Sequence, residues 1–251
     1  MSHTFGGVFA LNGISERKEF QVASGVMRVT DPCYDMDTWC AGEIPAANGT
    51  WIGHVGYGTD PDDLKSALKW WDEHLKEETE FAKKLAENVP ADKRDAYAKH
   101  MLDSHLLRRP KPSEESCRRV QYIHVVHQSL ATELDAPTVF TDYELVDKLH
   151  VGVDSGQAGF FDRGPYAEAV SDKDHRGREG ARFEAFYDHI CEQTLGPTQF
   201  AGNGYGVASS SGWGDGGYSC YVKKDAAGQA VAAFIAFIWD GGDEEEEGDD
   251  A

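Results

Sequence analysis

The sequence is poor in positive charge. Its 24 lysines and arginines stand against 44 aspartates and glutamates, which gives a formal net charge of −20. Nonspecific nucleic-acid binding depends on basic side chains that displace counterions from phosphates, so we do not expect direct nucleic-acid binding. An acidic protein can instead mimic DNA, but that requires carboxylates spread over a folded face. Here eight of the acids are concentrated in residues 240–251, which we expect to form a disordered acidic tail.

Long apolar runs are also missing. No segment approaches the roughly 18 residues of a membrane span, and the first residues lack the basic stretch and apolar core of a signal peptide. We therefore expect no membrane association and a cytoplasmic location. The cysteines are few, odd in number and widely spaced, which argues against a zinc finger or a disulfide framework and favours reduced thiols. They are Cys33, Cys40, Cys117, Cys191 and Cys220.

Most of the remaining sequence has a β-type pattern. Residues 19–31 alternate apolar and polar side chains around a Ser-Gly pair, which predicts two short strands joined by a tight turn. Proline cannot donate to a strand ladder, so this pairing ends at Asp31-Pro32. Residues 49–58 predict another strand, and residues 229–238 are apolar enough for a strand in the middle of the core.

The period changes after Asp60, which is a good helix N-cap followed by Pro61 at the first helical position. Apolar residues then recur at helical spacing until Pro90, and residues 91–107 supply a second amphipathic segment. The two predict a helical hairpin, over about residues 60–112, inserted into a β-rich body. Residues 181–194 predict a further, shorter helix.

We therefore expect an α+β fold with a mainly antiparallel β-sheet core, arranged as a sandwich or a partly closed barrel. Residues 1–239 would form a single domain that carries the helical hairpin insertion, with the acidic tail at 240–251.

A glycine-rich loop, "SSSGWGDGGYSCY" at residues 209–221, is the most distinctive local motif. Its glycines suit a bulged hairpin turn, and its spacing matches neither a phosphate-binding loop nor a nucleophile elbow. Asp215 in this loop joins Asp31 and Asp154 as aspartates that follow a β-type segment and lie beside proline or glycine. Each alone is a typical turn cap.

If the three strand ends converge, the aspartates would form a rim able to hold a ligand or a divalent cation, or an acid/base pair. The residues expected to share this rim are Tyr34, Gln157, Phe160, Ser211, Trp213 and Tyr218.

Cysteine and histidine are two further residue types with possible chemical roles. Cys33 follows Asp31-Pro32 and is a candidate thiol nucleophile, although no histidine is its neighbour in sequence. His124 and His127 lie an odd number of residues apart in a predicted strand, so they should face opposite sides and not share a metal. We expect both histidines to be partly exposed.

Three segments together resemble a known family, domain of unknown function 4241 from bacteria and phages. They are "SGVMRVTDPCY", "VGVDSGQAGFFD" and the C-terminal strand–turn–strand that begins "GVASSSGWGDGGY". The matching positions include Asp31 and Pro32, then Asp154, Gly156, Phe160 and Asp162, then Ser211, Gly212, Gly214, Asp215, Gly216 and Tyr218. The resemblance implies a β-rich fold, a bacterial or phage origin and no established activity. The helical hairpin departs from the family's pattern.

Two functions remain open at this level. The first is a noncatalytic binding or accessory protein that acts through the glycine, aromatic and aspartate rim or through the helical hairpin. The second is a hydrolase-like enzyme that uses the clustered aspartates, with or without a divalent cation. The sequence leaves open whether the partner is a protein or a small molecule.

Overall fold

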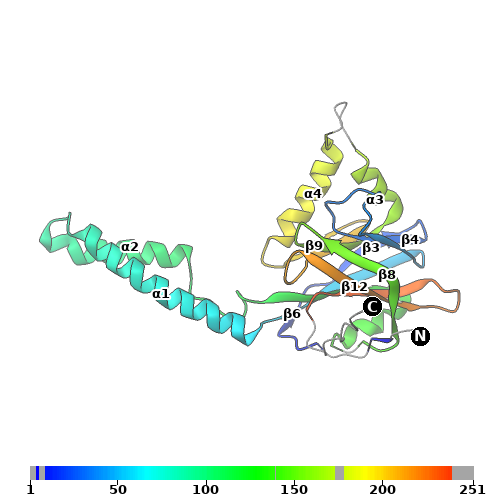
Figure 1. Ribbon diagram of the computed structural model, residues 1–251, viewed down its shortest axis with the longest axis horizontal. Coiled ribbons are helices and arrows are strands. Elements are labelled where there is room, and N and C mark those ends of the chain that lie inside the picture. Colours follow the sequence, from blue (N-terminus) through cyan, green and yellow to red (C-terminus); the bar gives the residue numbers. More distant parts are fainter. Residues whose placement is uncertain (1–3, 6–8, 139, 173–177, 239–251) are drawn as a thin grey trace, which may run out of the picture. The chain divides into compact units, whose positions relative to one another are not determined.

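The computed structural model describes residues 4–5, 9–138, 140–172 and 178–238, so the predicted tail lies outside the described residues. Contacts divide the chain into two compact units (Figure 1). The sheet unit comprises Met1–Gly58 and Arg119–Ala251, and the helical hairpin comprises Thr59–Arg118.

The larger sheet is antiparallel, with strand order β1-β8-β12-β13-β7-β6-β2 and with β3 also paired to β6. Some of its neighbouring strands are far apart in the chain: β12 pairs with β8 on one side and with β13 on the other. The strands are β1 (Thr4–Phe5), β2 (Gly13–Ile14), β3 (Lys18–Val22), β6 (Gly49–Gly58), β7 (Arg119–His127), β8 (Tyr143–Val153), β12 (Gly216–Lys224) and β13 (Ala230–Ala236).

The smaller sheet is also antiparallel, with order β10-β11-β9-β4-β5. Its strands are β4 (Val26–Thr30), β5 (Gly42–Pro45), β9 (Gln157–Asp162), β10 (Phe200–Asn203) and β11 (Gly206–Ser210). Because β4 and β9 pair directly, the segment that precedes Asp31 lies beside the segment that follows Asp154.

The main core lies between the two sheets. One apolar cluster joins residues of the larger sheet, such as Trp51 and Ile235, to residues of the smaller sheet, such as Val29 and Phe160. The outer face of the smaller sheet is covered by α3 (Arg163–Val170) and α4 (Ala181–Thr194), which pack Phe183 and other side chains against it. The predicted α+β fold is confirmed as a two-sheet sandwich, and the described strands do not close into a barrel.

The helical hairpin consists of α1 (Pro61–Ala86), the 3₁₀ turn η1 (Ala91–Lys93) and α2 (Arg94–Arg108). As the sequence predicts, Asp60 caps α1, since its side chain accepts a hydrogen bond from the backbone N–H of Asp62 at 2.7 Å. At the base of the hairpin the Thr59 hydroxyl donates to the Glu114 carbonyl at 2.8 Å, so both ends of the unit meet.

Some local expectations need correction. The two strands predicted within residues 19–31 are β3 and β4, but they belong to different sheets and do not pair with each other. The segment between them turns instead onto Asp162, whose carboxylate accepts the backbone N–H groups of Ala23 and Ser24. His124 is buried, not partly exposed, whereas His127 is intermediate. The sequence reading also missed α3 and the 3₁₀ segment η2 (Gln128–Asp135).

None of the helices in the described ranges combines the length and the apolar character that a membrane crossing requires.

Candidate functional site

Asp31 fastens the turn after β4 to the turn after β8. Its side chain is fully buried and accepts four hydrogen bonds. Oδ1 accepts from the backbone N–H of Cys33 at 2.9 Å and from the Ser155 hydroxyl at 2.7 Å. Oδ2 accepts from the backbone N–H groups of Asp154 and Ser155 at 2.9 and 2.8 Å. Both carboxylate oxygens are therefore used inside the protein, and the residue acts as a cap between two turns.

The glycine-rich loop docks onto the same place. The backbone N–H of Ser211 donates to the Gly156 carbonyl at 2.9 Å, and the Ser211 hydroxyl donates to the Gly214 carbonyl at 2.7 Å. Tyr218 donates to the same Gly214 carbonyl at 2.8 Å. Gly212 and Gly214 have φ values of 64° and 98°, a backbone region that favours glycine. The loop conformation is thus held by hydrogen bonds at its start and its end.

We call the combination of three loops, residues 31–41, 154–156 and 211–215, the loop junction. The structure brings together the three segments that the sequence singled out, but it does not gather their carboxylates. Asp31 is buried, while Asp154 and Asp215 are exposed. Within the described ranges, none of the groups of three closely spaced metal-ligand side chains includes any of these aspartates.

The first loop of the junction is braced from inside the protein. Arg28 on β4 is 5% exposed, and its guanidinium donates to the carbonyls of Asp35, Met36 and Thr38 at 3.3, 3.1 and 3.4 Å. The Tyr166 hydroxyl on α3 donates to the Tyr34 carbonyl at 2.5 Å. This braced loop presents Trp39, which is 91% exposed.

A second exposed tryptophan lies in the glycine-rich loop. Trp213 is 51% exposed, and the Arg119 guanidinium lies 4.5 Å from the centroid of its ring. Arg119 also donates to the Gly212 carbonyl at 3.3 Å. A cation over the face of an indole is an attractive arrangement, so Arg119 stabilises the position of this ring.

The other residues predicted for the rim mostly lie inside the protein. Gln157 accepts from the Thr194 hydroxyl at 3.0 Å and donates to the Cys191 sulfur at 3.4 Å, which ties β9 to α4. Tyr34 is partly exposed. Buried members of the predicted set are Gln157, Phe160, Ser211 and Tyr218.

The environment of Cys33 favours the protonated thiol. Burial raises the pKa of Cys33 well above the usual thiol range, and the neighbouring charge of Asp31 raises it further. The thiolate, and not the thiol, is the nucleophile in cysteine chemistry. This position is therefore poorly suited to nucleophilic catalysis.

Sequence reasoning missed Trp39 and Arg28. A tryptophan between turn-forming residues in "DMDTWCAG" was a usable signal, because a large aromatic residue in a loop either packs or contacts a partner. Arg28 carried no comparable signal. Its role depends on backbone carbonyls, and these point toward its guanidinium only once the loop has folded.

Comparisons with known proteins give a family but no activity. The family model described as "Protein of unknown function (DUF4241)" matches residues 77–235. The match begins inside α1 and includes α2, so it extends into the hairpin that the sequence analysis set apart from the family, while Asp31 and Pro32 lie before it. No curated protein and no solved structure matches the chain. Because the matched range covers more than half of the chain, the protein belongs to the DUF4241 family of proteins of unknown function.

Proposed function

We propose that the chain is a noncatalytic binding or accessory protein, active in a bacterial or phage-infected cytoplasm, whose loop junction binds another protein. One observation carries this proposal: two tryptophans are exposed on loops whose backbones are fixed from within. Trp39 stands on the loop braced by Arg28, and Trp213 stands on the loop held by Ser211. Exposing large apolar rings to water is unfavourable unless something covers them.

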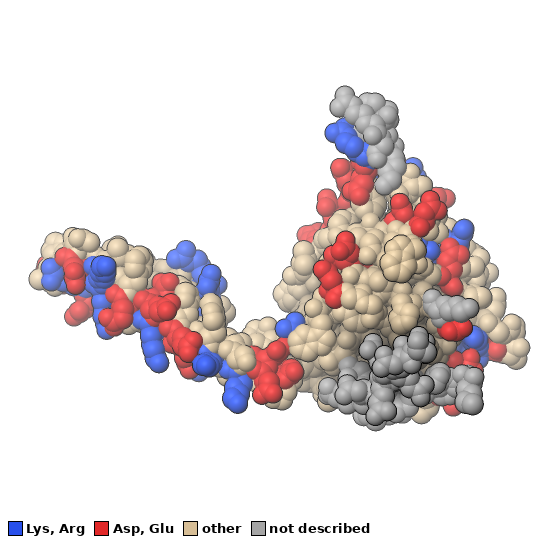
Figure 2. Space-filling view, viewed as in Figure 1, with Lys and Arg blue, Asp and Glu red and all other residues tan. Residues whose placement is uncertain are grey.

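The chemistry of the junction favours a basic protein surface as the partner. Its exposed carboxylates are Asp35, Asp37, Asp154 and Asp215. The hairpin carries 14 acidic and 12 basic residues and residues 240–251 carry eight acids, so the rest of the sheet unit has a net charge of −10. On the face drawn in Figure 2, basic and acidic side chains mix along the hairpin. Tryptophan and arginine are also the residues most enriched among strong contacts between proteins.

The hydrolase-like alternative has less support. It needs a free carboxylate or thiolate, or a divalent cation held by Asp31, Asp154 and Asp215. Asp31 accepts four internal hydrogen bonds, and the raised pKa of Cys33 keeps its thiol protonated. The hairpin is a second candidate surface, since Trp70 and Phe81 on α1 are 52% and 54% exposed.

Site-directed photo-crosslinking in cells that natively make the protein tests this proposal. A photoreactive phenylalanine analogue replaces Trp39 or Trp213, and the matched control replaces Ala227, which is exposed in the turn at the opposite end of β12. We expect one adduct protein common to positions 39 and 213 and absent at 227. With that protein purified, Trp39→Ala and Trp213→Ala should each weaken binding by about tenfold or more, and added salt should weaken it further.

Absence of a shared adduct, or binding that neither tryptophan substitution changes, would show that the junction is not a protein-binding surface. An adduct at all three positions would also contradict the proposal, because crosslinking that includes the control position reflects nonspecific contact.

A further inference from the structure

The helical hairpin has very little apolar core of its own. Among its described residues, α1 buries only Ala82 and Ala86, and α2 buries none. Large side chains that remain exposed include Trp70 at 52%, Phe81 at 54% and Leu107 at 87%. Two-helix units of this size commonly need a disulfide, a metal or a partner to hold a fixed structure, because the area they bury is small.

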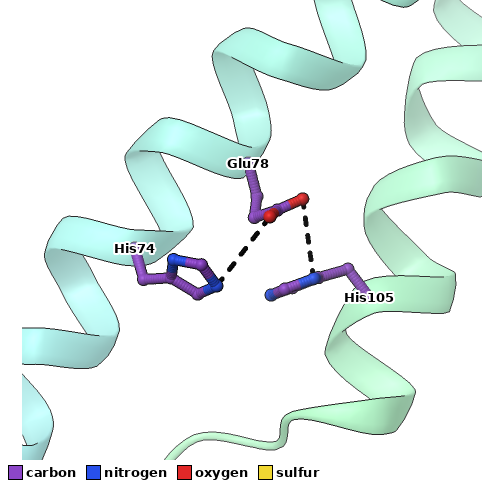
Figure 3. A group of neighbouring side chains, drawn as sticks. All are labelled: His74, Glu78 and His105. Atoms are coloured by element: carbon purple, nitrogen blue, oxygen red, sulfur yellow. Dashed lines mark ion pairs between the residues drawn. The ribbon is translucent and has the colours of Figure 1, made fainter.

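A cluster of metal-ligand side chains lies between the two helices. His74 and Glu78 are one turn apart on α1 and so share a face, and His105 approaches them from α2 (Figure 3). The Glu78 carboxylate lies between the imidazoles, with Oε1 at 3.8 Å from His74 Nε2 and Oε2 at 3.6 Å from His105 Nδ1. One ligand atom from each residue lies within 4.8 Å of the other two.

We propose that this cluster is a transition-metal site of the zinc type that clamps α1 to α2. Zinc is bound by imidazole nitrogens and carboxylate oxygens at about 2.0 to 2.2 Å, so the three ligand atoms need to approach one another by roughly an ångström. Side-chain rotation supplies a movement of this size without displacing the helices. Two imidazoles select zinc, nickel, cobalt or copper over magnesium and calcium, which prefer oxygen ligands.

A small cavity beside two of the three ligands can hold a fourth ligand. Glu78 and His105 line a small cavity of about 40 Å³ with Phe81, Met101 and Arg108 among its other walls. That volume is sufficient for a water molecule as the fourth ligand. On the other side, Glu77 Oε2 lies 3.8 Å from His74 Nδ1. A small rotation of either side chain would bring this carboxylate to hydrogen-bond distance of Nδ1, where it would orient His74 as a metal ligand.

One group competes with the metal. Arg109 lies with a terminal nitrogen 3.4 Å from His74 Nε2 and with its guanidinium 5.9 Å from the centroid of Trp70. The Trp70 ring is itself stacked on His74 at a centroid distance of 4.9 Å. Metal binding therefore requires Arg109 to leave His74 Nε2, and the adjacent tryptophan face gives its charge another favourable position.

The test is zinc titration of the metal-stripped full chain by calorimetry, together with cobalt absorption spectroscopy. We expect one zinc per chain at this site, and magnesium should not compete. His105→Ala removes the ligand from α2 and should weaken zinc binding by about tenfold or more. His100→Ala is the matched control, because His100 is exposed on the same helix, and it should bind zinc as the wild type does. Glu78→Gln, which keeps the side-chain size, should weaken binding in the same direction.

The five cysteines give an alternative place for zinc, and cobalt distinguishes the two. A site of nitrogen and oxygen ligands lacks the thiolate-to-cobalt charge-transfer band that cysteine ligands give. Equal zinc affinity of wild type, His105→Ala and Glu78→Gln would overturn the proposal, as would a charge-transfer band that persists in both variants. Since Glu78→Gln preserves helix propensity and size, it keeps the test decisive even if His105→Ala disturbs the hairpin.

Discussion

At the scale of single residues, the loop junction depends on one buried carboxylate. Asp31 satisfies three backbone N–H groups and one hydroxyl from two different turns. Hydrogen bonds to a charged acceptor are stronger than neutral ones, and a buried donor that loses its acceptor is costly. The sequence made the same residue a candidate metal ligand. In that role its carboxylate would be repelled by the neighbouring carboxylates in the absence of metal, so replacing Asp31 with asparagine would stabilise the metal-free protein.

We therefore predict that Asp31→Asn destabilises the protein by about 2 kcal/mol or more, because the amide nitrogen would face N–H donors. Chemical denaturation followed by fluorescence measures the change. The control is Asp154→Asn, whose side chain is exposed and whose substitution should change stability by less than about 0.5 kcal/mol. Equal stability of Asp31→Asn and the wild type would contradict the capping role.

How much could be predicted from sequence differs from residue to residue. Asp60 and the helix at residues 181–194 were predictable because capping and helical periodicity are local, and α4 has the expected bounds. The convergence of the three aspartate segments was only a condition at the level of sequence, because their strands lie in two different sheets whose packing is not local. That Asp31 points inward was not predictable, because three of its four donors lie more than 120 residues away in the chain. The brace that Arg28 gives to the loop of Trp39 was hidden for a different reason: its carbonyl partners lie within ten residues in the chain, but only the folded loop turns them toward the guanidinium.

At the scale of secondary-structure elements, β6 and β7 carry a pair of buried histidines. His54 and His124 are direct partners in the strand register, and their ring centroids lie 5.1 Å apart. Each Nε2 is near a tyrosine hydroxyl, but in the described part of the structure neither Nδ1 has a hydrogen-bond partner. Burial, with a contribution from Arg17, lowers the pKa of His54 to about 4. Burial and then His54 lower the pKa of His124 well below its usual value.

This pair predicts acid sensitivity. The unfolded chain binds a proton at each imidazole near pH 6.5, whereas the folded chain resists protonation until about pH 4 at His54. The stabilising contribution is therefore complete above about pH 6.5 and is lost as the pH falls toward 4, by up to about 1.4 kcal/mol per pH unit for each histidine. Denaturation curves at a series of pH values measure the slope.

His54→Phe should flatten that slope. The Tyr122 hydroxyl keeps its hydrogen bond to the Pro137 carbonyl at 2.7 Å, so the substitution does not leave this hydroxyl without a partner. His100→Ala, which alters an exposed histidine, should leave the slope unchanged. A His54→Phe variant with the wild-type pH dependence would show that His54 does not contribute to acid sensitivity.

At the scale of the whole molecule, the hairpin interrupts a pair of neighbouring strands. Gly58, the last residue of β6, is the register partner of Arg119, the first residue of β7. The two strand ends that the hairpin connects are therefore already side by side in the sheet unit. All of Thr59–Arg118 lies outside that unit's core.

Replacing Thr59–Arg118 with a two-residue Asn-Gly turn should leave a folded sheet unit, because such a turn closes an antiparallel pair directly. We expect a cooperative thermal transition and a β-type circular dichroism spectrum. Deletion of α4, which buries Phe183, Phe186 and Ile190 against the smaller sheet, is the control and should abolish the transition. A hairpin deletion that melts without cooperativity would show that the helices belong to the core.

The hydrogen bond that closes the base of the hairpin, from the Thr59 hydroxyl to the Glu114 carbonyl, also bears on how the chain folds. Closing a long flexible loop costs chain entropy that grows with the logarithm of its length. Helices form in about a microsecond, faster than most strands find distant partners. Once α1 and α2 have paired, the sixty or so intervening residues shrink to a short span, and β6 meets β7 almost as if they were neighbours in sequence. The insertion thereby slows the search for this strand pair far less than its length suggests.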